Sequence, residues 1–280
     1  MIEINVKTKI TLENLLQNEG FNYNKIKALF RKKDIKVNGE KVNTNVNLKE
    51  GDNVKIYAKS LYNIPVVYED EKIIIVDKPK KLEVISETKS LSLLNLISHN
   101  YFAVHRLDYN TEGLVVFAKN LETKNELDFA FKNQLVDKTY VTICLNKPQK
   151  SEMLIEDYLL KENNKVKIFK SQVKGSKVCK TKISLLEFKN GYSLLKVNLL
   201  TGRTHQIRAH LAFYNLFVLG DEKYGDFKTN KLLNLKSQIL KCTNLKFHLN
   251  KGSDLYYLNN LNFSLNIESI ENLFKDITKS

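Results

Sequence analysis

Hydrophobic runs of strand length recur along most of the chain. Apolar and β-branched residues dominate the segments 71–78, 113–119, 139–145, 180–188 and 193–200, which we therefore predict to be strands. The run GLVVFA at 113–118 contains no polar residue, as expected of a strand covered on both faces. Residues 121–134 have the pattern of a helix with Asn120 as its N-cap, and a hairpin is predicted at Asn190 and Gly191. This irregular order of elements favours a mixed, largely antiparallel sheet.

The first 58 residues have a pattern of their own. Ile26, Leu29 and Phe30 fall at helical spacing after Asn24, which we predict to be the N-cap of a helix. Two short strands follow, one with an Asn-Gly turn and one after a Glu-Gly-Asp turn. Several basic residues lie largely away from the apolar stripe of the helix: Lys25, Arg31, Lys32 and Lys33. They form either a surface for a polyanion or a solvated helix face.

Residues 59–66, which include Pro65, are predicted to link this unit to a second domain at 67–280. The segment is short and has no run of Gly and Ser, so we do not expect a long flexible tether. A chain of 280 residues can bury one sizeable core beside a small companion. We therefore expect two domains, 1–58 and 67–280.

One carboxylate, Asp108, stands shortly before the strand predicted at 113–119. Residues two apart in an extended segment project from the same side, so Arg106 is predicted to lie beside Asp108 and keep it ionised. The surrounding sequence, HRLDYNTEG, is rich in turn-forming residues. Asp108 is therefore either a candidate catalytic carboxylate or a structural residue of a solvated turn.

A second segment, 199–225, contains a candidate partner for this carboxylate. A predicted strand turns there into a short helix that has Ile207 and Leu211 on its apolar side and Arg208 on another face. A guanidinium ordered on a helix matches the two oxygens of a carboxylate better than one on a loop. Arg208 is thus predicted to pair with Asp108, the alternative being a basic helix that faces solvent.

Four segments together resemble a known family. They are HRLDYNTEGLVVFAKN at 105–120, LLTGRTHQIRAHLAFYNLFVLGDEKYG at 199–225, KTYVTICLN at 138–146 and VDKPKKLEV at 76–84. The first is similar to the catalytic motif of the RluA branch of the pseudouridine synthases, which act on ribosomal and transfer RNA. The second resembles a later motif of that branch, the third the motif with the active-site Tyr, and the fourth the strand and Lys-Pro turn that open the catalytic domain. The likeness spans roughly residues 67–263.

This resemblance implies an α+β catalytic domain that isomerises uridine in RNA to pseudouridine without a metal or an organic cofactor. Asp108 would be the nucleophile or a carboxylate that stabilises positive charge on the sugar. Arg208 would pair with it, and Tyr140 would stack on the uracil or help to remove a proton from its carbon. Because the target must be flipped out of stacked RNA, His105 or Arg106 would fill the gap or hold a flanking phosphate.

The first 58 residues resemble a second family, the alpha-L RNA-binding fold. The likeness rests on KALFRKKDIKVNG at 27–39 and LKEGDNVKI at 48–56. It implies that the basic residues of the predicted helix contact RNA: Lys25, Arg31, Lys32 and Lys33.

The chain departs from the synthase pattern at three positions. Lys81 and Asn146 stand where glycine is usual, and neither position is expected to take part in the chemistry. Lys241 stands where histidine is more usual, in a segment similar to the last core strand of the family. We expect Leu240 to provide the apolar contact of the cleft wall.

Composition agrees with a protein that binds a polyanion. The chain has 45 Lys and Arg against 31 Asp and Glu, which leaves a formal charge of +14, although membrane-surface proteins are also basic. No run approaches the roughly 18 apolar residues of a membrane span, and residues 1–10 lack the apolar core of a secretory signal. We expect a cytoplasmic protein that acts on ribosomal RNA or tRNA as a monomer, without membrane association.

Neither the cysteines nor the histidines have the spacing of a metal site. Cys144, Cys179 and Cys242 are far apart and are expected to be reduced thiols. His205 and His210 are five residues apart, so they share a helix face poorly, and they have no acidic or cysteine companion.

Two other classes of function are open to a chain of this composition. A ribosome-associated RNA-binding protein without catalysis would explain the charge and the first unit, but it would not need Asp108, Tyr140 and Arg208 together. A nucleic-acid hydrolase would use several carboxylates around a metal, whereas the motif at 105–120 offers one before its strand.

Overall fold

The computed structural model describes residues 2–19, 21, 23–57, 64–86, 92–98, 100–162 and 165–279, with the side chains at 2, 24 and 25 excepted. The chain divides into two compact units, Met1–Ile64 with Ile85–His99, and Pro65–Val84 with Asn100–Ser280. Residues 85–99 therefore group with the first unit. Of the expected linker, residues 59–63 lie outside the described part, and its last residue, Val66, opens a strand.

The first unit has a four-stranded antiparallel sheet of order β1-β6-β3-β4 and a separate pair, β2 and β5. Its core includes Leu12, Leu16, Ile26, Ile35 and Ile56. The elements are β1 (Ile2–Asn5), β2 (Ile10–Thr11), α1 (Leu12–Asn18), α2 (Tyr23–Lys32), β3 (Ile35–Val37), β4 (Glu40–Val42), β5 (Asn47–Leu48), β6 (Asn53–Ile56) and α3 (Leu93–Ile97).

Local sequence explains most of this unit, with one correction. The apolar residues expected on one face of α2, such as Ile26 and Leu29, are buried. Asn38 and Gly39 have φ angles of 50° and 89°, so the expected tight turn joins β3 to β4. The prediction that Asn24 caps the helix was wrong, because α2 begins at Tyr23 and Asn24 lies inside it.

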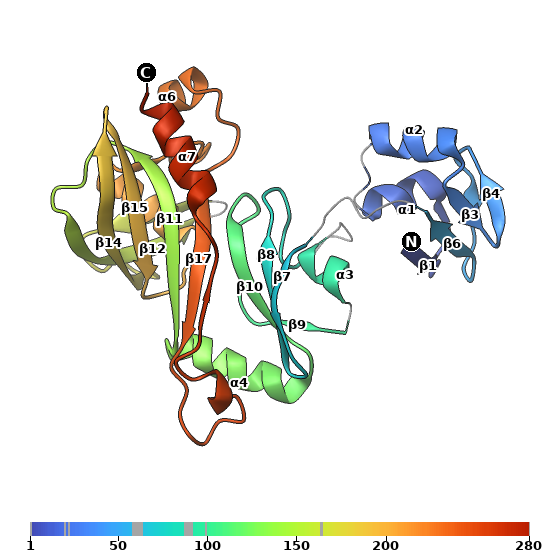
Figure 1. Ribbon diagram of the computed structural model, residues 1–280, viewed down its shortest axis with the longest axis horizontal. Helices are drawn as coiled ribbons and strands as arrows, with labels where there is room; N and C mark the ends of the chain where they lie inside the picture. Colours follow the sequence, from blue (N-terminus) through green and yellow to red (C-terminus); the bar gives the residue numbers. More distant parts are fainter. Residues whose placement is uncertain are drawn as a thin grey trace. The chain divides into compact units, whose positions relative to one another are not determined.

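The second unit contains one large mixed sheet of order β13-β12-β14-β15-β11-β17-β10-β8-β7 (Figure 1). Every neighbouring pair on this path is antiparallel except β10 with β17, which confirms the expected α+β fold with a mixed, largely antiparallel sheet. Its strands are β7 (Val66–Glu69), β8 (Ile73–Lys78), β9 (Phe102–Ala103), β10 (Glu112–Ala118), β11 (Val136–Leu145), β12 (Glu152–Glu162), β13 (Lys165–Phe169), β14 (Lys177–Lys189), β15 (Tyr192–Leu199), β16 (Phe217–Val218), β17 (Leu240–Phe247) and β18 (Asn262–Ser264).

The parallel contact between β10 and β17 depends on a glycine. Gly113 has a φ of 114°, and a Cβ built on it would lie 2.1 Å from the carbonyl oxygen of Cys242. Only glycine lets the two backbones approach this closely. Beyond Gly113, all side chains of β10 are buried, as predicted from its unbroken apolar run.

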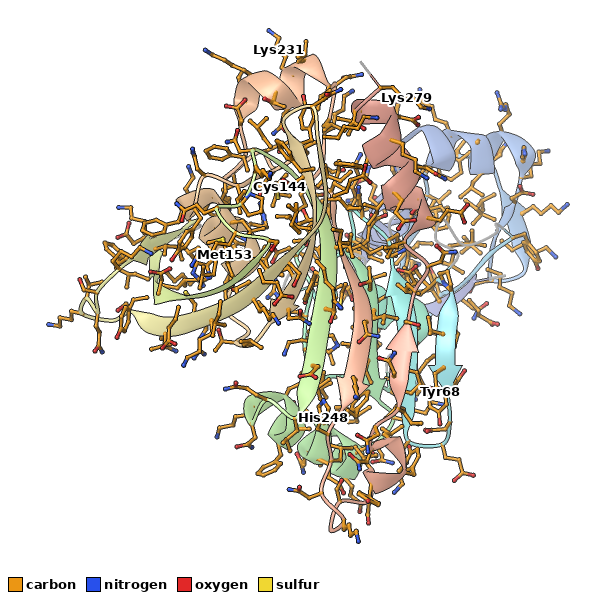
Figure 2. All side chains as sticks on the ribbon, turned by 60° about the vertical axis from the view of Figure 1, so that its left-hand side comes forward. Tyr68, Cys144, Met153, Lys231, His248 and Lys279 are labelled. Carbon is orange, nitrogen blue, oxygen red and sulfur yellow. The ribbon has the colours of Figure 1, made fainter. Side chains whose placement is uncertain are left out.

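Helices cover this sheet at several points: α4 (Leu121–Lys132), α5 (Gln206–Phe213), α6 (Phe227–Leu232), α7 (Glu268–Ile277) and the short 3-10 helix η1 (Tyr256–Leu258). As expected, Asn120 caps α4 by accepting a hydrogen bond from the backbone N–H of Thr123. Cys144 lies in the interior on β11, whereas Lys231 and Lys279 project outward from α6 and the end of α7 (Figure 2). None of the helices described here is long and apolar enough to span a membrane.

The two faces of β11 have different neighbours. Val141 and Ile143 pack against α7, in a cluster that includes Ile270 and Phe274. Successive side chains of a strand point to opposite faces, so the even-numbered side chains near Tyr140 point away from α7. The candidate site lies on that second face.

Helix α5 is fastened to the sheet by a buried polar relay of Gln206, Thr181, His210 and Asp157. Gln206 Nε2 donates to Thr181 Oγ1 (3.1 Å), Thr181 Oγ1 lies 3.0 Å from His210 Nδ1, and His210 Nε2 lies 3.0 Å from Asp157 Oδ2. Burial lowers the pKa of His210, and Asp157 opposes this only in part. A carboxylate only accepts, so Nε2 of the neutral ring donates to Asp157 and Nδ1 accepts from Thr181.

The relay extends at both ends. Asp157 is fully buried, and its Oδ2 also accepts from Tyr214 Oη at 2.7 Å. Its Oδ1 accepts no hydrogen bond within the described residues and is balanced by an ion pair with Lys170 at 3.1 Å. At the other end, Gln206 Oε1 accepts from Thr201 Oγ1 (2.8 Å) and from the backbone N–H of Arg203 (3.1 Å). The relay thereby fixes both α5 and the loop that leads into it.

We predict that His210→Gln reduces the pH dependence of stability. The folded-state pKa of His210 lies below its ordinary value of 6.5, so on acidification below about 6.5 the unfolded chain takes up a proton that the folded chain does not. The free energy of unfolding of the wild type should therefore fall, by up to about 1.4 kcal/mol per pH unit for this proton. Urea unfolding measured between about pH 5 and pH 7 should show that the free energy of unfolding changes less with pH in the variant than in the wild type. An equal change with pH would contradict the prediction.

Candidate active site

A cavity of about 540 Å³ opens on the face of β11 that points away from α7. Its volume lies within the range of small-molecule sites, roughly 300 to 1,000 Å³. Four parts of the second unit line it: the loop before β10, the end of α4 with β11, the loop that leads into α5 with the first turn of that helix, and Leu240 of β17. The structure brings together in this cavity five of the residues selected from sequence: His105, Arg106, Asp108, Tyr140 and Arg208.

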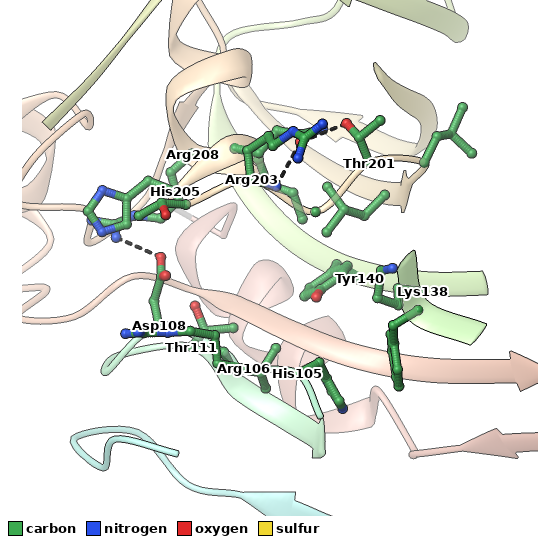
Figure 3. A pocket seen from close by; sticks show the side chains of 18 of the residues that line it. His105, Arg106, Asp108, Thr111, Lys138, Tyr140, Thr201, Arg203, His205 and Arg208 are labelled. Carbon is green, nitrogen blue, oxygen red and sulfur yellow. Dashed lines mark hydrogen bonds and ion pairs between the residues drawn. The ribbon is translucent and has the colours of Figure 1, made fainter. Parts of the chain in front are cut away.

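Asp108 and Arg208 form an ion pair at one end of the cavity (Figure 3). Arg208 Nη1 donates to Asp108 Oδ2 at 2.9 Å, across 100 residues of sequence. The guanidinium is largely buried, whereas about a quarter of the Asp108 side chain remains exposed toward the cavity. The pairing predicted between these residues is therefore present.

Its geometry differs from the prediction in two respects. The bidentate contact of Arg208 is made to Asp221, with Nε and Nη2 donating at 2.7 and 2.8 Å, so Asp108 receives a single hydrogen bond. Arg106 is exposed and, within the described residues, forms no ion pair with Asp108. The expectation that Arg106 is the cation beside Asp108 was wrong, because Asp108 pairs instead with Arg208 on α5.

Asp221 is the member of this site that the sequence analysis missed. Its side chain is fully buried and also accepts from the backbone N–H groups of Lys223 (2.8 Å) and Tyr224 (3.1 Å). Burial raises its pKa, but the contacts from Arg208 and the backbone outweigh this and hold the pKa below its usual value. The sequence feature that could have identified Asp221 is its position as a charged residue directly after Gly220, at the end of an apolar stretch.

Two opposing effects act on Arg208. Burial disfavours its charge, but the hydrogen bonds and charges of Asp221, and then those of Asp108, hold its pKa above the ordinary value. The ring of Tyr224 lies 5.3 Å from its central carbon and adds a cation–π contact. Asp221 thus aligns a permanently charged guanidinium, and the third nitrogen of that guanidinium, Nη1, donates to Asp108.

Lys78 fixes the loop that carries Asp108 through hydrogen bonds to backbone carbonyl groups. This side chain has no exposed surface, and its ammonium donates to the carbonyl oxygens of Pro79 (2.9 Å), Leu82 (2.7 Å) and Tyr109 (3.3 Å). Burial lowers the pKa of Lys78 to about 8, and the charge of Asp108 opposes the shift. Three carbonyl acceptors therefore connect the Lys-Pro turn to the residue that follows Asp108.

Tyr140 lies on the cavity wall and is almost completely buried. Burial, followed by Cys242 and Asp108, raises its pKa well above the ordinary value, so the phenol remains protonated at neutral pH. A general base works best when its pKa lies near the operating pH. These properties favour a stacking role for Tyr140 over proton removal.

His105 and Arg106 have different environments despite being neighbours. His105 Nε2 accepts a hydrogen bond from the backbone N–H of Val116 (3.0 Å), and its ring stacks on Phe131 with centroids 4.5 Å apart. Burial and the nearby charge of Lys138 lower the pKa of His105 to about 3, so it offers a phosphate no positive charge. Arg106 is exposed and remains available to an anion.

The basic residues expected to bind RNA in the first unit belong to α2 and the residue after it. Arg31, Lys32 and Lys33 are exposed, and Lys33 has a φ of 55° just beyond the end of the helix. The side chain of Lys25 lies outside the described part of the structure.

Two of the departures from the synthase pattern have a backbone explanation. Lys81 and Asn146 have φ angles of 61° and 74°, a conformation in which glycine has the least steric cost. The third, Lys241, pairs with Asp77 at 3.1 Å, while Leu240 lines the cavity as expected. Within the described residues, no three His, Cys, Asp or Glu side chains gather as metal ligands. The three cysteines are free and buried.

Residues 72–213, about half of the chain, match the family model described as RNA pseudouridylate synthase. An uncharacterized RNA pseudouridine synthase of Helicobacter pylori is 34% identical over 70% of this chain and 67% of its own length. Ribosomal large subunit pseudouridine synthase C of Rickettsia bellii is 30% identical over 72% of this chain and 78% of its own. Human RNA pseudouridylate synthase domain containing 4 has the same fold, with a TM-score of 0.60, 21% identity, and coverage of 75% and 93%.

The residues that match the family model include both Asp108 and Arg208. These matches agree with the resemblance found in the motifs at 105–120 and 199–225. The chain therefore belongs to the RNA pseudouridylate synthase family and is an isomerase that acts on RNA.

Proposed function

We propose that this enzyme isomerises specific uridines of large-subunit ribosomal RNA, with Asp108 as the catalytic carboxylate. The observation that carries the proposal is the ion pair of Asp108 with Arg208 at the end of a cavity large enough for a nucleoside. The name of the Rickettsia bellii relative supports ribosomal RNA as the substrate class, and tRNA is the alternative.

The reaction breaks the bond between uracil N1 and ribose C1′, turns the base, and joins it again through C5. As positive charge develops on the sugar, a carboxylate either attacks C1′ or stabilises that charge, as in glycoside cleavage. Asp108 has the required exposure to the cavity, and its other side is held by Arg208. Tyr140 would support the flat face of the uracil.

Exposed cations around the cavity suit the backbone of a flipped nucleotide. Arg106, Lys132 and Arg203 are all exposed and line the cavity. A base in a stacked helix cannot reach a carboxylate inside a cavity, so it must leave the stack, and its phosphates would then remain near the rim. We assign phosphate binding to these three cations and a stacking contact to Phe131 and His105.

We further propose that residues 1–58 form an RNA-binding module similar to the alpha-L fold. Support comes from the exposed basic residues of α2 and from lysines on its small sheet, such as Lys36 and Lys41. Salt-dependent binding of RNA phosphates by this module would raise the affinity for RNA without changing the rate of the chemical step.

Asp108→Asn is expected to lower pseudouridine formation by at least about 10³-fold while leaving RNA binding largely intact, because the amide keeps the shape but loses the charge. The measurement is tritium release from RNA labelled at uracil C5, which a non-catalytic RNA-binding protein or a hydrolase would not produce. Asp226→Asn is a matched control, since asparagine can replace the N-cap of α6. Substantial turnover by the Asp108 variant would refute the assignment.

Arg208→Lys and Asp221→Asn are both expected to reduce turnover, because each one breaks the bidentate contact that aligns the guanidinium. Breaking a buried pair can also cost about 3 to 5 kcal/mol of stability, so each variant needs an unfolding curve. Expressed as activation free energies, the loss of activity in the double variant should be smaller than the sum of the losses in the two single variants. Additive losses would show that Asp221 does not act through Arg208.

Reversing the charge of Arg31 and Lys32 to Glu should weaken RNA binding. Each lost phosphate contact is expected to reduce the slope of log affinity against log salt by roughly 0.7 to 0.9. Turnover at saturating RNA should persist, because Asp108 and Arg208 belong to the other unit. With Lys161→Glu as an exposed control on β12, an unchanged salt slope would mean that the first unit does not grip RNA.

Sequencing pseudouridines in ribosomal and transfer RNA, from strains with and without the gene, would identify the target. Loss of a site in the large-subunit RNA is the expected result. Loss confined to tRNA would replace ribosomal RNA as the substrate class and leave the chemistry unchanged.

A further inference from the structure

Lys138 is a cation within the cavity that the mechanism described above does not use. It lies two residues before Tyr140 on β11, so both side chains project from the same face of the strand and line the cavity. Its neighbour Asp137 projects from the opposite face, where it pairs with His248 at 2.8 Å. In the part of the chain that the structure describes, no carboxylate forms an ion pair with Lys138.

The surroundings of Lys138 differ from those of the other cavity cations. Arg106, Lys132 and Arg203 are exposed, whereas Lys138 is half-buried and its ammonium lies 5.4 Å from the centre of the Phe131 ring. Burial lowers its pKa, and Cys242 and Asp137 offset this only in part. An unpaired cation that is partly removed from water costs stability, so a negative charge supplied by the substrate would be stabilised there.

With Lys138, the cavity has a negative group, Asp108, and a positive group at two different places. Figure 3 shows Tyr140 between the Asp108–Arg208 pair and Lys138. A uracil supported by Tyr140 would have its ribose toward Asp108 and part of its ring toward the ammonium. When the bond between N1 and C1′ breaks, positive charge develops on the sugar and negative charge on the base. Fixed charges of opposite sign at these two places stabilise that transition state more than the ground state.

We propose that Lys138 is a further catalytic residue, whose ammonium contacts a carbonyl oxygen of the target uracil and stabilises the departing uracil anion. The proposal rests on the proposed function of this cavity. The electron pair of the broken bond goes to N1 and spreads onto the ring carbonyl oxygens. A new bond then forms from C5 to C1′, the C5 proton passes to solvent or a base, and N1 takes up a proton. Lys138 keeps its own proton throughout.

A backbone phosphate is the other anion that Lys138 could meet, and the geometry favours the base. Phosphates are strongly hydrated, and three exposed cations already serve them at the rim. Lys138 instead has aromatic rings as neighbours, Phe131 by direct contact and Tyr140 on the same strand face. Such walls suit the flat, less hydrated ring of uracil.

The test compares Lys138→Met with Lys138→Arg in the full-length enzyme. At saturating RNA, the methionine variant should lose about 10²-fold to 10³-fold in kcat, the usual effect of removing one donor to a developing negative charge. Its RNA affinity and the salt slope of that affinity should stay near wild type. Its melting temperature should be equal or higher, because an unpaired, partly buried cation has been removed. The arginine variant should recover part of the lost kcat.

Lys246→Met is the matched control. Lys246 is half-buried on the neighbouring strand β17 and lies opposite Asp137, on the face that does not line the cavity. Its kcat should equal that of the wild type. A normal kcat for Lys138→Met would overturn the proposal. If the salt slope of RNA affinity were also reduced, that result would assign Lys138 to a phosphate. A large drop in melting temperature would instead make Lys138 structural and would also overturn it.

The two levels of inference fail in different ways. If the wild-type enzyme releases no tritium from labelled RNA, the proposed function fails and the role of Lys138 falls with it. If the wild type is active and Asp108→Asn is not, while Lys138→Met retains full kcat, only the role of Lys138 is refuted.

Discussion

Arg208 bridges two aspartates, and the arrangement of the cavity depends on this contact. Two donors of its guanidinium hold the buried Asp221, and a third meets Asp108 from a loop 100 residues earlier in the chain. Asp221 in turn sits in a turn that requires Gly220, where a Cβ would lie 2.1 Å from the carbonyl oxygen of Ser237. Because a buried guanidinium is tolerated only with its partners in place, the bridge fixes α5 and the Asp108 loop relative to each other.

Two further buried polar groups hold the two sides of this bridge. Lys78 ties the Asp108 loop to the Lys-Pro turn through three carbonyl acceptors, and the relay from Asp157 to Gln206 ties α5 to β12 and β14. Each of these groups would be expensive to bury alone, and each is satisfied by partners from distant segments. The result is a carboxylate, Asp108, that is held by ordered supports, and in the proposed mechanism such supports would limit reorganisation during the reaction.

Charged side chains of both signs line the cavity. Asp108 provides the negative charge at one end, Lys138 a half-buried positive charge beside Tyr140, and exposed cations the rim. Tyr140 and His105 stay neutral because burial shifts the pKa of each away from its charged form. In the proposed mechanism, these charges would stabilise a positive sugar and a negative base as the bond breaks.

Local sequence was sufficient for several elements and for the choice of candidate site residues. The apolar run of β10, the cap Asn120, the turns at Asn38 and Asn190, and the motifs containing Asp108, Tyr140 and Arg208 depend on neighbours within a few positions. The tertiary structure decided which side chains pair. Arg208 makes its bidentate contact with Asp221 and not with Asp108, and His105 is a neutral acceptor for the backbone N–H of Val116. Among the residues that the structure describes, Lys138 has no carboxylate in an ion pair. Such pairings depend on which strands and loops come close together in the folded sheet. The spacing of residues along the chain does not indicate which distant segments will do so.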